Sequence, residues 1–239
     1  MDYSTPCSYS IRLIDKLKSL DTKNLLDFNL INKAISWARK YHGDQKRKSG
    51  EPYYSHPLEV AYMISEYKLK TDVIAASILH DIVEDTEVTV GMIHGSFGQR
   101  IAEMVDRLTR DRPDGSKLSV KDILNNSYQE KDREVLLIKL FDRLHNIQTL
   151  GAISPEKVKK ITKETLNFFI VTTMYMGYKN LEKTIYEICC NNLSIDSSFD
   201  KDFQFSECKS YLDSLEVSHS HRTVSQVFQN VINQIKNRE

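Results

Sequence analysis

The apolar residues of this 239-residue chain recur at intervals of three and four positions, which places them on one face of an α-helix. The segment LINKAISWARKYHG shows the pattern, with Ile31, Ala34, Ile35, Ala38 and Tyr41 on one side. Alternating strand-like runs with Gly-centred hairpin turns are absent, and only eight glycines occur. The chain is therefore predicted to be all-α.

The same periodicity predicts further helices along the chain. They are expected at roughly 57–67, 71–82, 89–95 and 101–108, and over about 130–147 and 155–191. Proline suits a helix start because its missing N–H has no partner there, so His56-Pro57 should open the first of these. Thr71 or Asp72 is expected to cap the next. The polar segment RDRPDGSKLS, 110–119, is expected to be a mobile surface loop.

Three parts are expected in the domain organisation. Residues 1–28 form an N-terminal helical lead-in, and 29–192 form the main domain. Near Asn191 the composition shifts to SIDSSFDKDFQFSE, which is typical of a linker. Residues 193–239 are therefore predicted to be a linker and a short helical tail.

Charge and cysteine usage restrict the class of protein. The 33 basic and 33 acidic residues cancel, so no overall field favours nucleic acid or an anionic membrane. No signal peptide is recognisable, and no apolar stretch approaches the ~20 residues of a membrane span. A cytoplasmic protein is expected, with neither nucleic acid nor membrane as a partner. Cys189 and Cys190, adjacent in an apolar helical pattern, are expected to be buried thiols.

A cluster of polar residues lies at the end of one predicted helix whose sequence is otherwise apolar. The apolar run DVIAASILHD ends in His80-Asp81, and Glu84-Asp85 follow one turn later. Neighbours on a helix diverge by about 100°, so both can reach one ion only near a helix end or bend. A histidine nitrogen with an aspartate oxygen suits Mn, Fe or Zn better than Ca. An acidic cluster on a solvated helix end is the alternative.

Two distant segments carry matching residue types. His56 lies in PYYSHP, where the alternative role is a loop residue or helix cap. Asp142 follows the apolar run VLLIKLF, where the alternative is a structural pairing with Arg143 or Arg107. The basic strip KRK ends eight residues before His56, and this position favours an anion site over an ordinary solvated surface.

Taken together, these segments resemble one known arrangement. HGDQKRKSGEPYYSHP, LHDIVEDT, FG and IKLFDRLHNIQTL are similar to the hydrolase domain of the RelA/SpoT alarmone family, within the HD superfamily, over approximately residues 30–192. The resemblance implies a multi-helix HD-domain bundle with a metal site at its centre, and makes 29–192 an HD-type hydrolase domain. No segment resembles the family's synthetase domain. The chain is expected to be a hydrolase-only form, similar to small alarmone hydrolases, or a hydrolase fragment of a larger ancestor.

Residue by residue, the resemblance implies a complete site. It makes His56, His80, Asp81 and Asp142 ligands of one Mn²⁺, Glu84 and Asp85 the catalytic acidic pair, and Arg47, Lys48, Ser49, Arg143, Asn146 and Thr149 nucleotide contacts. Arg47 would lie against the guanine and Lys48 near phosphate. The implied reaction removes the 3′-pyrophosphate of guanosine tetra- or pentaphosphate and leaves GDP or GTP.

Two other functions remain open from the sequence. One is an HD-family phosphohydrolase of another phosphorylated nucleotide, and the other is a non-catalytic nucleotide- or partner-binding module. The family has a small residue where Phe141 precedes Asp142, so the ring is either absorbed by the core or displaces that ligand. The 110–119 loop also departs from the family pattern, which leaves substrate gating open. The sequence does not settle the oligomeric state.

The remaining histidines are assigned to other roles. His145 is expected to support the site or the fold, His42 to pack near the basic strip, and His94 to lie on the surface of a short helix. His219 and His221 have no carboxylate or cysteine partner at ligand spacing, so they are not expected to bind metal.

Overall fold

The computed structural model describes residues 5–112 and 114–193. The chain divides into two compact units, Met1–Ser127 with Glu134–His145, and Tyr128–Arg133 with Asn146–Glu239. Within the described residues the regular structure is helical, with two isolated β-bridges, Lys46–Pro52 and Asp111–Lys117. The all-α prediction is confirmed. The predicted tail helices, and His219 and His221, lie outside the described residues.

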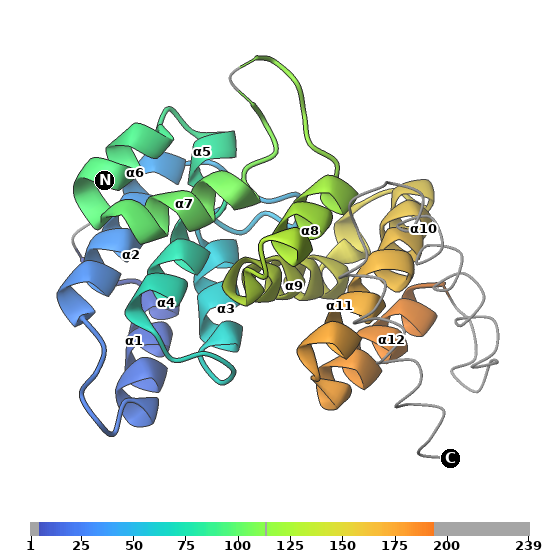
Figure 1. The fold of residues 1–239 in the computed structure, drawn as a ribbon, viewed down its shortest axis with the longest axis horizontal. Helices are drawn as coiled ribbons and strands as arrows, with labels where there is room; N and C mark the ends of the chain where they lie inside the picture. The colour runs from blue at the N-terminus through green and yellow to red at the C-terminus, as the bar shows by residue number, and fades with distance from the viewer. Residues whose placement is uncertain (1–4, 113, 194–239) are drawn as a thin grey trace. The chain divides into compact units, whose positions relative to one another are not determined.

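The helices follow one another along the chain, with the longer connections before α3 and before α8 (Figure 1). They are α1 Ser8–Leu20, α2 Phe28–His42, α3 Ser55–Ile64, α4 Thr71–Leu79, α5 Ile82–Asp85, α6 Val90–Phe97, α7 Gln99–Leu108, α8 Val120–Gln129 and α9 Arg133–Gln148. The helices α1 to α7 belong to the first unit, together with most of α8 and α9.

Helix α4 forms the core of the first unit. Every side chain from Val73 to Leu79 is buried, and α2, α3 and α7 all contact this helix. Its sequence is a continuous apolar run because neighbours cover it on several sides. Burying one Ile or Leu side chain contributes roughly 1.5–3 kcal/mol relative to exposure. The helix end that carries His80 is thus fixed by the best-packed element of the unit.

Two predicted helix starts differ in detail from the structure. Helix α3 begins at Ser55, and Pro57 still lies in the first turn, where its missing N–H costs no helical bond. The predicted cap of α4 is wrong, because the N-cap is Lys70 and no side chain caps the helix. The Thr71 hydroxyl instead accepts the backbone N–H of Asp27 at 2.9 Å, at the start of α2.

The second unit contains the shorter helical pieces. These are η1 Leu150–Ala152, α10 Pro155–Glu164, the π-helical turn η2 Thr165–Phe169, α11 Ile170–Met176 and α12 Lys179–Leu193, with α12 packed on α10 and α11. The pattern predicted over 155–191 is therefore broken, at η2 and at Gly177. Gly177 has φ +77°, a conformation that favours glycine and ends α11. Cys189 and Cys190 are buried free thiols, as predicted.

Helix α8 was missed because its sequence, VKDILNNSYQ, is rich in weak helix formers such as asparagine. A signal was present just before it. The Ser119 hydroxyl accepts the N–H of Asp122 at 3.1 Å, while the Asp122 carboxylate accepts the N–H of Ser119 at 2.8 Å. This reciprocal cap is a recognised start of a helix.

The loop before α8 is closed by hydrogen bonds between its two ends. Arg110 and Leu118 exchange hydrogen bonds, and the N–H of Arg112 donates to the Ser116 carbonyl at 3.0 Å. The predicted mobility of this loop stays a prediction.

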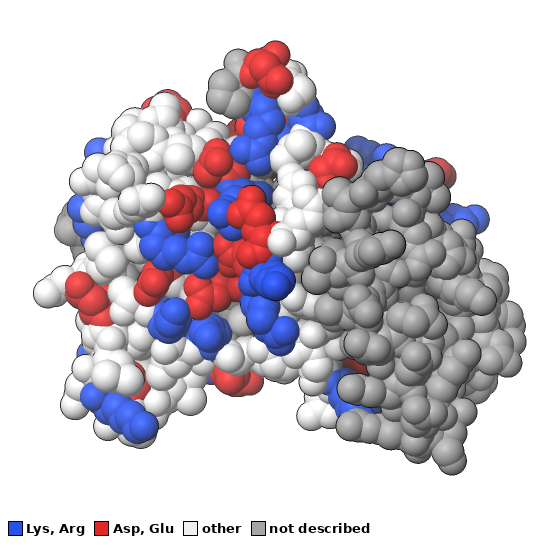
Figure 2. Space-filling model, in the orientation of Figure 1, with Lys and Arg blue, Asp and Glu red and all other residues white. Residues whose placement is uncertain are grey.

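Surface charge on the first unit is mixed. Figure 2 shows Lys and Arg side chains interspersed with Asp and Glu over its helices, in keeping with the balanced composition. Among the described residues, no helix combines the length and apolar character needed to cross a bilayer.

Candidate metal centre

At the break between α4 and α5, two polar side chains, those of His80 and Asp81, lie close together. His80 caps the C-terminus of α4, and Asp81 is the N-cap of α5. Nε2 of His80 lies 3.1 Å from Oδ1 of Asp81. A single straight helix would turn these neighbours apart, so the bend expected from the sequence is present.

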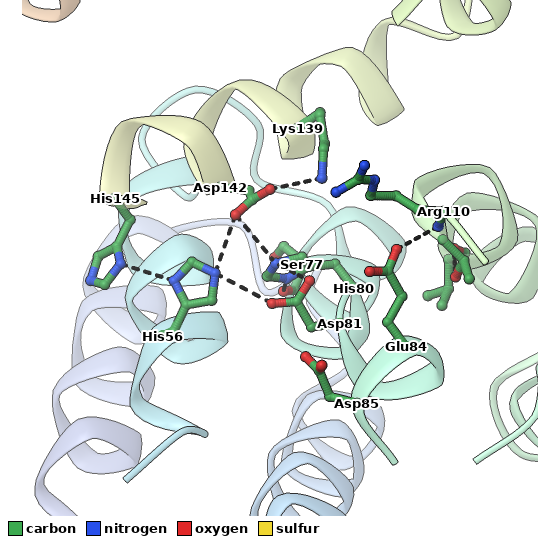
Figure 3. A network of polar contacts seen from close by, with 12 residues as sticks. His56, Ser77, His80, Asp81, Glu84, Asp85, Arg110, Lys139, Asp142 and His145 are labelled. Carbon is green, nitrogen blue, oxygen red and sulfur yellow. Dashed lines mark hydrogen bonds and ion pairs between the residues drawn. The ribbon is translucent and has the colours of Figure 1, made fainter. Parts of the chain in front are cut away.

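Helices α3 and α9 deliver the other members of the cluster. Nε2 of His56 lies 3.2 Å from Oδ1 of Asp142 and 3.5 Å from Oδ2 of Asp81. Nε2 of His80 lies 3.8 Å from the same Asp142 oxygen. Figure 3 shows the Asp142 carboxylate pointing from α9 toward both imidazoles. His56, His80 and Asp142 are buried, and each offers a ligand atom within 4.8 Å of the others.

The two histidines are held by their opposite nitrogens. Nδ1 of His80 donates to the Ser77 carbonyl at 2.8 Å, and Nδ1 of His56 lies 2.9 Å from Nδ1 of His145. Nε2 of His80 is buried and has no hydrogen-bond partner of good geometry among the described residues. A buried nitrogen left unsatisfied is costly, and a metal ion would satisfy it. Two imidazoles with two carboxylates suit Mn, Fe or Zn.

A lysine that the sequence interpretation overlooked completes the charge balance. Nζ of Lys139 lies 2.9 Å from Oδ2 of Asp142, and both side chains are buried. Burial would raise the pKa of Asp142, but the Lys139 ammonium and the two imidazoles hold that pKa well below its usual range. The spacing of three residues on one helix was the available signal.

His80 and Asp81 form a second charge pair. Burial would lower the pKa of His80, but the carboxylates of Asp81 and Asp142 outweigh burial and raise it to about 10. Burial would raise the pKa of Asp81, but His80 outweighs burial and holds it below its usual range. Without a metal, His80 is therefore protonated at neutral pH and compensates the carboxylates.

Glu84 and Asp85 lie beside the cluster on α5 (Figure 3). The Tyr53 hydroxyl donates to Oδ2 of Asp85 at 2.6 Å, and the backbone N–H of Arg110 donates to Oε1 of Glu84. Burial raises the pKa of both carboxyl groups, although these donors oppose the shift. Sequence interpretation did not assign Tyr53, because the pairing depends on how the segment before α3 meets α5.

Phe141 is absorbed by the core. Its side chain is buried, and its ring packs on Tyr67 with centroids 4.9 Å apart. Asp142 keeps its contacts with His56 and Lys139 beside this ring. The structure therefore excludes the alternative in which the Phe141 ring displaces Asp142.

The predicted nucleotide strip occupies the turn between α2 and α3. Gly50 has φ +92°, and its N–H donates to the Arg47 carbonyl at 2.9 Å, so the turn favours glycine. Lys48 and Ser49 are exposed, and Arg47 is half-buried. Burial lowers the pKa of His145 to about 3, with help from nearby positive charge that includes Arg47. The charge of Arg47 thus acts on His145, whose side chain contacts His56 of the cluster.

The other predicted nucleotide contacts lie on or after α9. Arg143 is buried directly after Asp142, in the first unit. Asn146 and Thr149 are half-buried and belong to the second unit, where the Thr149 hydroxyl donates to the Asn146 carbonyl at 3.3 Å. Their contacts with nucleotide stay predictions.

Two histidines lie as expected outside the cluster. His42 is buried and stacks on Tyr53 with centroids 4.7 Å apart, near the basic strip. His94 is exposed on α6.

The fold and the cluster together define an all-α domain with a buried histidine–aspartate centre suited to a divalent metal. A family model described as HD domain matches residues 34–171, more than half of the chain. The chain belongs to the HD domain family.

Similar proteins carry the resemblance further. The chain is 35% identical over 180 residues to the GTP pyrophosphokinase rsh of Brucella ovis, covering 70% of this chain and 23% of that protein. It is 36% identical over 161 residues to the guanosine-3′,5′-bis(diphosphate) 3′-pyrophosphohydrolase of Aquifex aeolicus, covering 65% of this chain and 23% of that protein. The predicted homology to the RelA/SpoT family is confirmed, and the chain spans about a quarter of the length of these relatives.

The chain is also similar to a solved structure described as a metazoan ortholog of SpoT that hydrolyzes ppGpp. That structure aligns with 88% of this chain and 97% of its own, at 17% identity and a TM-score of 0.43.

Proposed function

We propose that this chain is a Mn²⁺-dependent guanosine 3′,5′-bis(diphosphate) 3′-pyrophosphohydrolase of the cytoplasm. The reaction converts guanosine tetra- or pentaphosphate and water to GDP or GTP and pyrophosphate. The observation that carries the proposal is the buried cluster of His56, His80 and Asp142, whose His80 Nε2 lacks a hydrogen-bond partner of good geometry among the described residues. The Aquifex aeolicus relative, named for the same reaction, supports the substrate class.

The proposed metal ligands are Nε2 of His56 and of His80, with carboxylate oxygens of Asp81 and Asp142. Nε2 of each imidazole lies 3.1 to 3.8 Å from carboxylate oxygens of Asp81 and Asp142. When bound, a divalent ion supplies Lewis acidity, which lowers the pKa of a bound water and polarises a phosphoryl oxygen. Manganese is proposed because the resemblance to the RelA/SpoT hydrolase domain implies it, and the mixed nitrogen and oxygen donor set is suited to it.

Glu84 and Asp85 are proposed to handle the protons of the reaction. Partial burial raises the pKa of both carboxyl groups, which brings each closer to the working pH of a general base. The Tyr53 hydroxyl fixes Oδ2 of Asp85 at 2.6 Å, so Oδ1 is the oxygen left to orient or deprotonate the attacking water. Glu84 is the second candidate for this role.

Substrate recognition is assigned to the basic strip and to residues on and after α9. Arg47 is proposed to lie against guanine and Lys48 near phosphate, with Ser49 beside them. A planar guanidinium suits base stacking and phosphate contacts. Arg143, Asn146 and Thr149 complete the proposed contacts. The proposed domain is 29–192, with 1–28 as its lead-in and 193–239 as linker and tail.

The first test measures pyrophosphate and GDP released from guanosine tetraphosphate, with Mn²⁺ and then with chelator. We expect Mn²⁺-dependent release of both products. Asp81→Ala should lose metal and activity together, while Glu84→Ala should keep metal and lose most turnover. Bound Mn²⁺ without GDP formation would contradict the substrate and direct attention to another phosphorylated nucleotide or to a binding role. Absence of Mn²⁺ binding would contradict the site itself.

A further inference from the structure

His145 lies against the outer side of one proposed metal ligand. Its Nδ1 is 2.9 Å from Nδ1 of His56, and the ring centroids are 4.8 Å apart. His56 is 2% exposed, so water does not compete freely for this contact. A hydrogen bond at that distance requires one nitrogen to carry the proton and the other to accept it.

The direction of this hydrogen bond decides what His56 can do. With its proton on Nδ1, His56 donates to His145, and its Nε2 lone pair faces the carboxylates of Asp81 and Asp142. With its proton on Nε2, His56 donates to Asp142 at 3.2 Å, and its lone pair, on Nδ1, faces His145 instead of the cluster. Only the first tautomer binds metal.

His80 shows the same arrangement with a different acceptor. Its Nδ1 donates to the Ser77 carbonyl at 2.8 Å, and a backbone carbonyl can only accept. The tautomer of His80 is therefore fixed by α4 itself. For His56 the equivalent acceptor is a side chain of α9, three residues after Asp142. Helix α9 thus supplies one proposed ligand, Asp142, and also His145, which orients a second proposed ligand, His56.

We propose that His145 is a positioning residue that accepts the Nδ1–H of His56 through its own Nδ1 and thereby presents Nε2 of His56 to the metal. This inference rests on the metal site of the proposed function. His145 serves as a neutral acceptor with its own proton on Nε2.

The test is equilibrium Mn²⁺ binding, followed by the paramagnetic resonance signal of free Mn²⁺. His145→Phe keeps an aromatic ring and removes the acceptor, so Mn²⁺ affinity should fall by about 10–100-fold. His145→Asn places an amide oxygen near the position of Nδ1 and should recover most of the affinity. The matched control is His94→Phe, at an exposed position on α6, which should bind as the wild type does.

The outcomes separate this inference from the proposed function. Wild-type protein that fails to bind Mn²⁺ overturns the metal site. Wild-type binding together with unchanged affinity in His145→Phe overturns the role of His145, as does an Asn variant that binds as weakly as the Phe variant. Should the Phe variant fail to fold, histidine ¹⁵N spectra of the Zn²⁺-loaded wild type decide the question. They should show His56 protonated on Nδ1, and protonation on Nε2 overturns the inference.

Discussion

The two carboxylate oxygens of Asp142 face different partners: Oδ2 lies 2.9 Å from Nζ of Lys139, and Oδ1 lies 3.2 Å from Nε2 of His56. The lysine therefore fixes the rotation of the carboxylate and leaves the other oxygen directed at the cluster. It also supplies a permanent positive charge beside Asp142 and Asp81. Buried charges are stable only when compensated, so the pair has a measurable energetic role.

Replacing Lys139 with Met should lower the free energy of unfolding by about 3–5 kcal/mol, the usual cost of leaving one partner of a buried pair uncompensated. Urea denaturation in chelator measures this change. Adding Mn²⁺ should recover part of the loss, because the ion compensates the same carboxylate.

The matched control is Lys70→Met. Lys70 pairs with Glu134 at 3.0 Å, but its side chain is 51% exposed. Exposed pairs contribute about 0–1 kcal/mol, so this variant should lose less than about 1 kcal/mol. Equal losses in the two variants would show that the burial of Lys139 has no special consequence.

Tyr53→Phe should shift the acid limb of the pH–rate profile to higher pH. The Tyr53 hydroxyl donates to Asp85 and stabilises its ionised form, so this bond opposes the upward pKa shift caused by burial. Removing the hydroxyl raises the pKa of Asp85 further, and a base must be ionised to act. The phenyl ring keeps the stacking partner of His42. If the acid limb does not move, Asp85 is not the base in the rate-limiting proton transfer.

Helical periodicity predicted most of the fold because the first unit buries regular apolar stripes. The continuous run of α4 and the face of α2 are set by local sequence. The break at η2 and the absence of a side-chain cap on α4 depend on tertiary packing, as does the use of Thr71 by α2. Helix α8 was missed because two asparagines, Asn125 and Asn126, weaken its pattern.

The site was predictable to the extent that its members lie in contiguous motifs. His80-Asp81 and Asp142 stand in recognisable segments, and their residue types indicate metal chemistry. Lys139 and Tyr53 carry no such mark, since a lysine in an amphipathic helix and a tyrosine in a loop are ordinary. Their roles arise only when α3, α5 and α9 meet, and that arrangement is a property of packing.

Saturating Mn²⁺ should raise the melting temperature of the wild type and leave Asp142→Ala unaffected by the ion. A ligand at 100-fold its Kd adds about 2.7 kcal/mol to stability, because it binds only the folded state. Thermal unfolding with Mn²⁺ and with chelator measures the shift. Asp15→Ala is the control, since Asp15 is exposed on α1 and should shift with Mn²⁺ as the wild type does. A Mn²⁺-induced shift retained in Asp142→Ala would remove Asp142 from the site.

Mn²⁺ affinity should rise steadily with pH across the range 6 to 8. The pKa of His80 is raised to about 10, so throughout this range its imidazole carries a proton that the ion must displace. Displacing one proton makes the affinity increase by roughly tenfold per pH unit below that pKa. Calorimetry in buffers of different ionisation enthalpy should detect about one proton released at pH 7. With an ordinary pKa near 6.5, the affinity would instead level off above about pH 7.5, and such a plateau would contradict the His80–Asp81 charge pair.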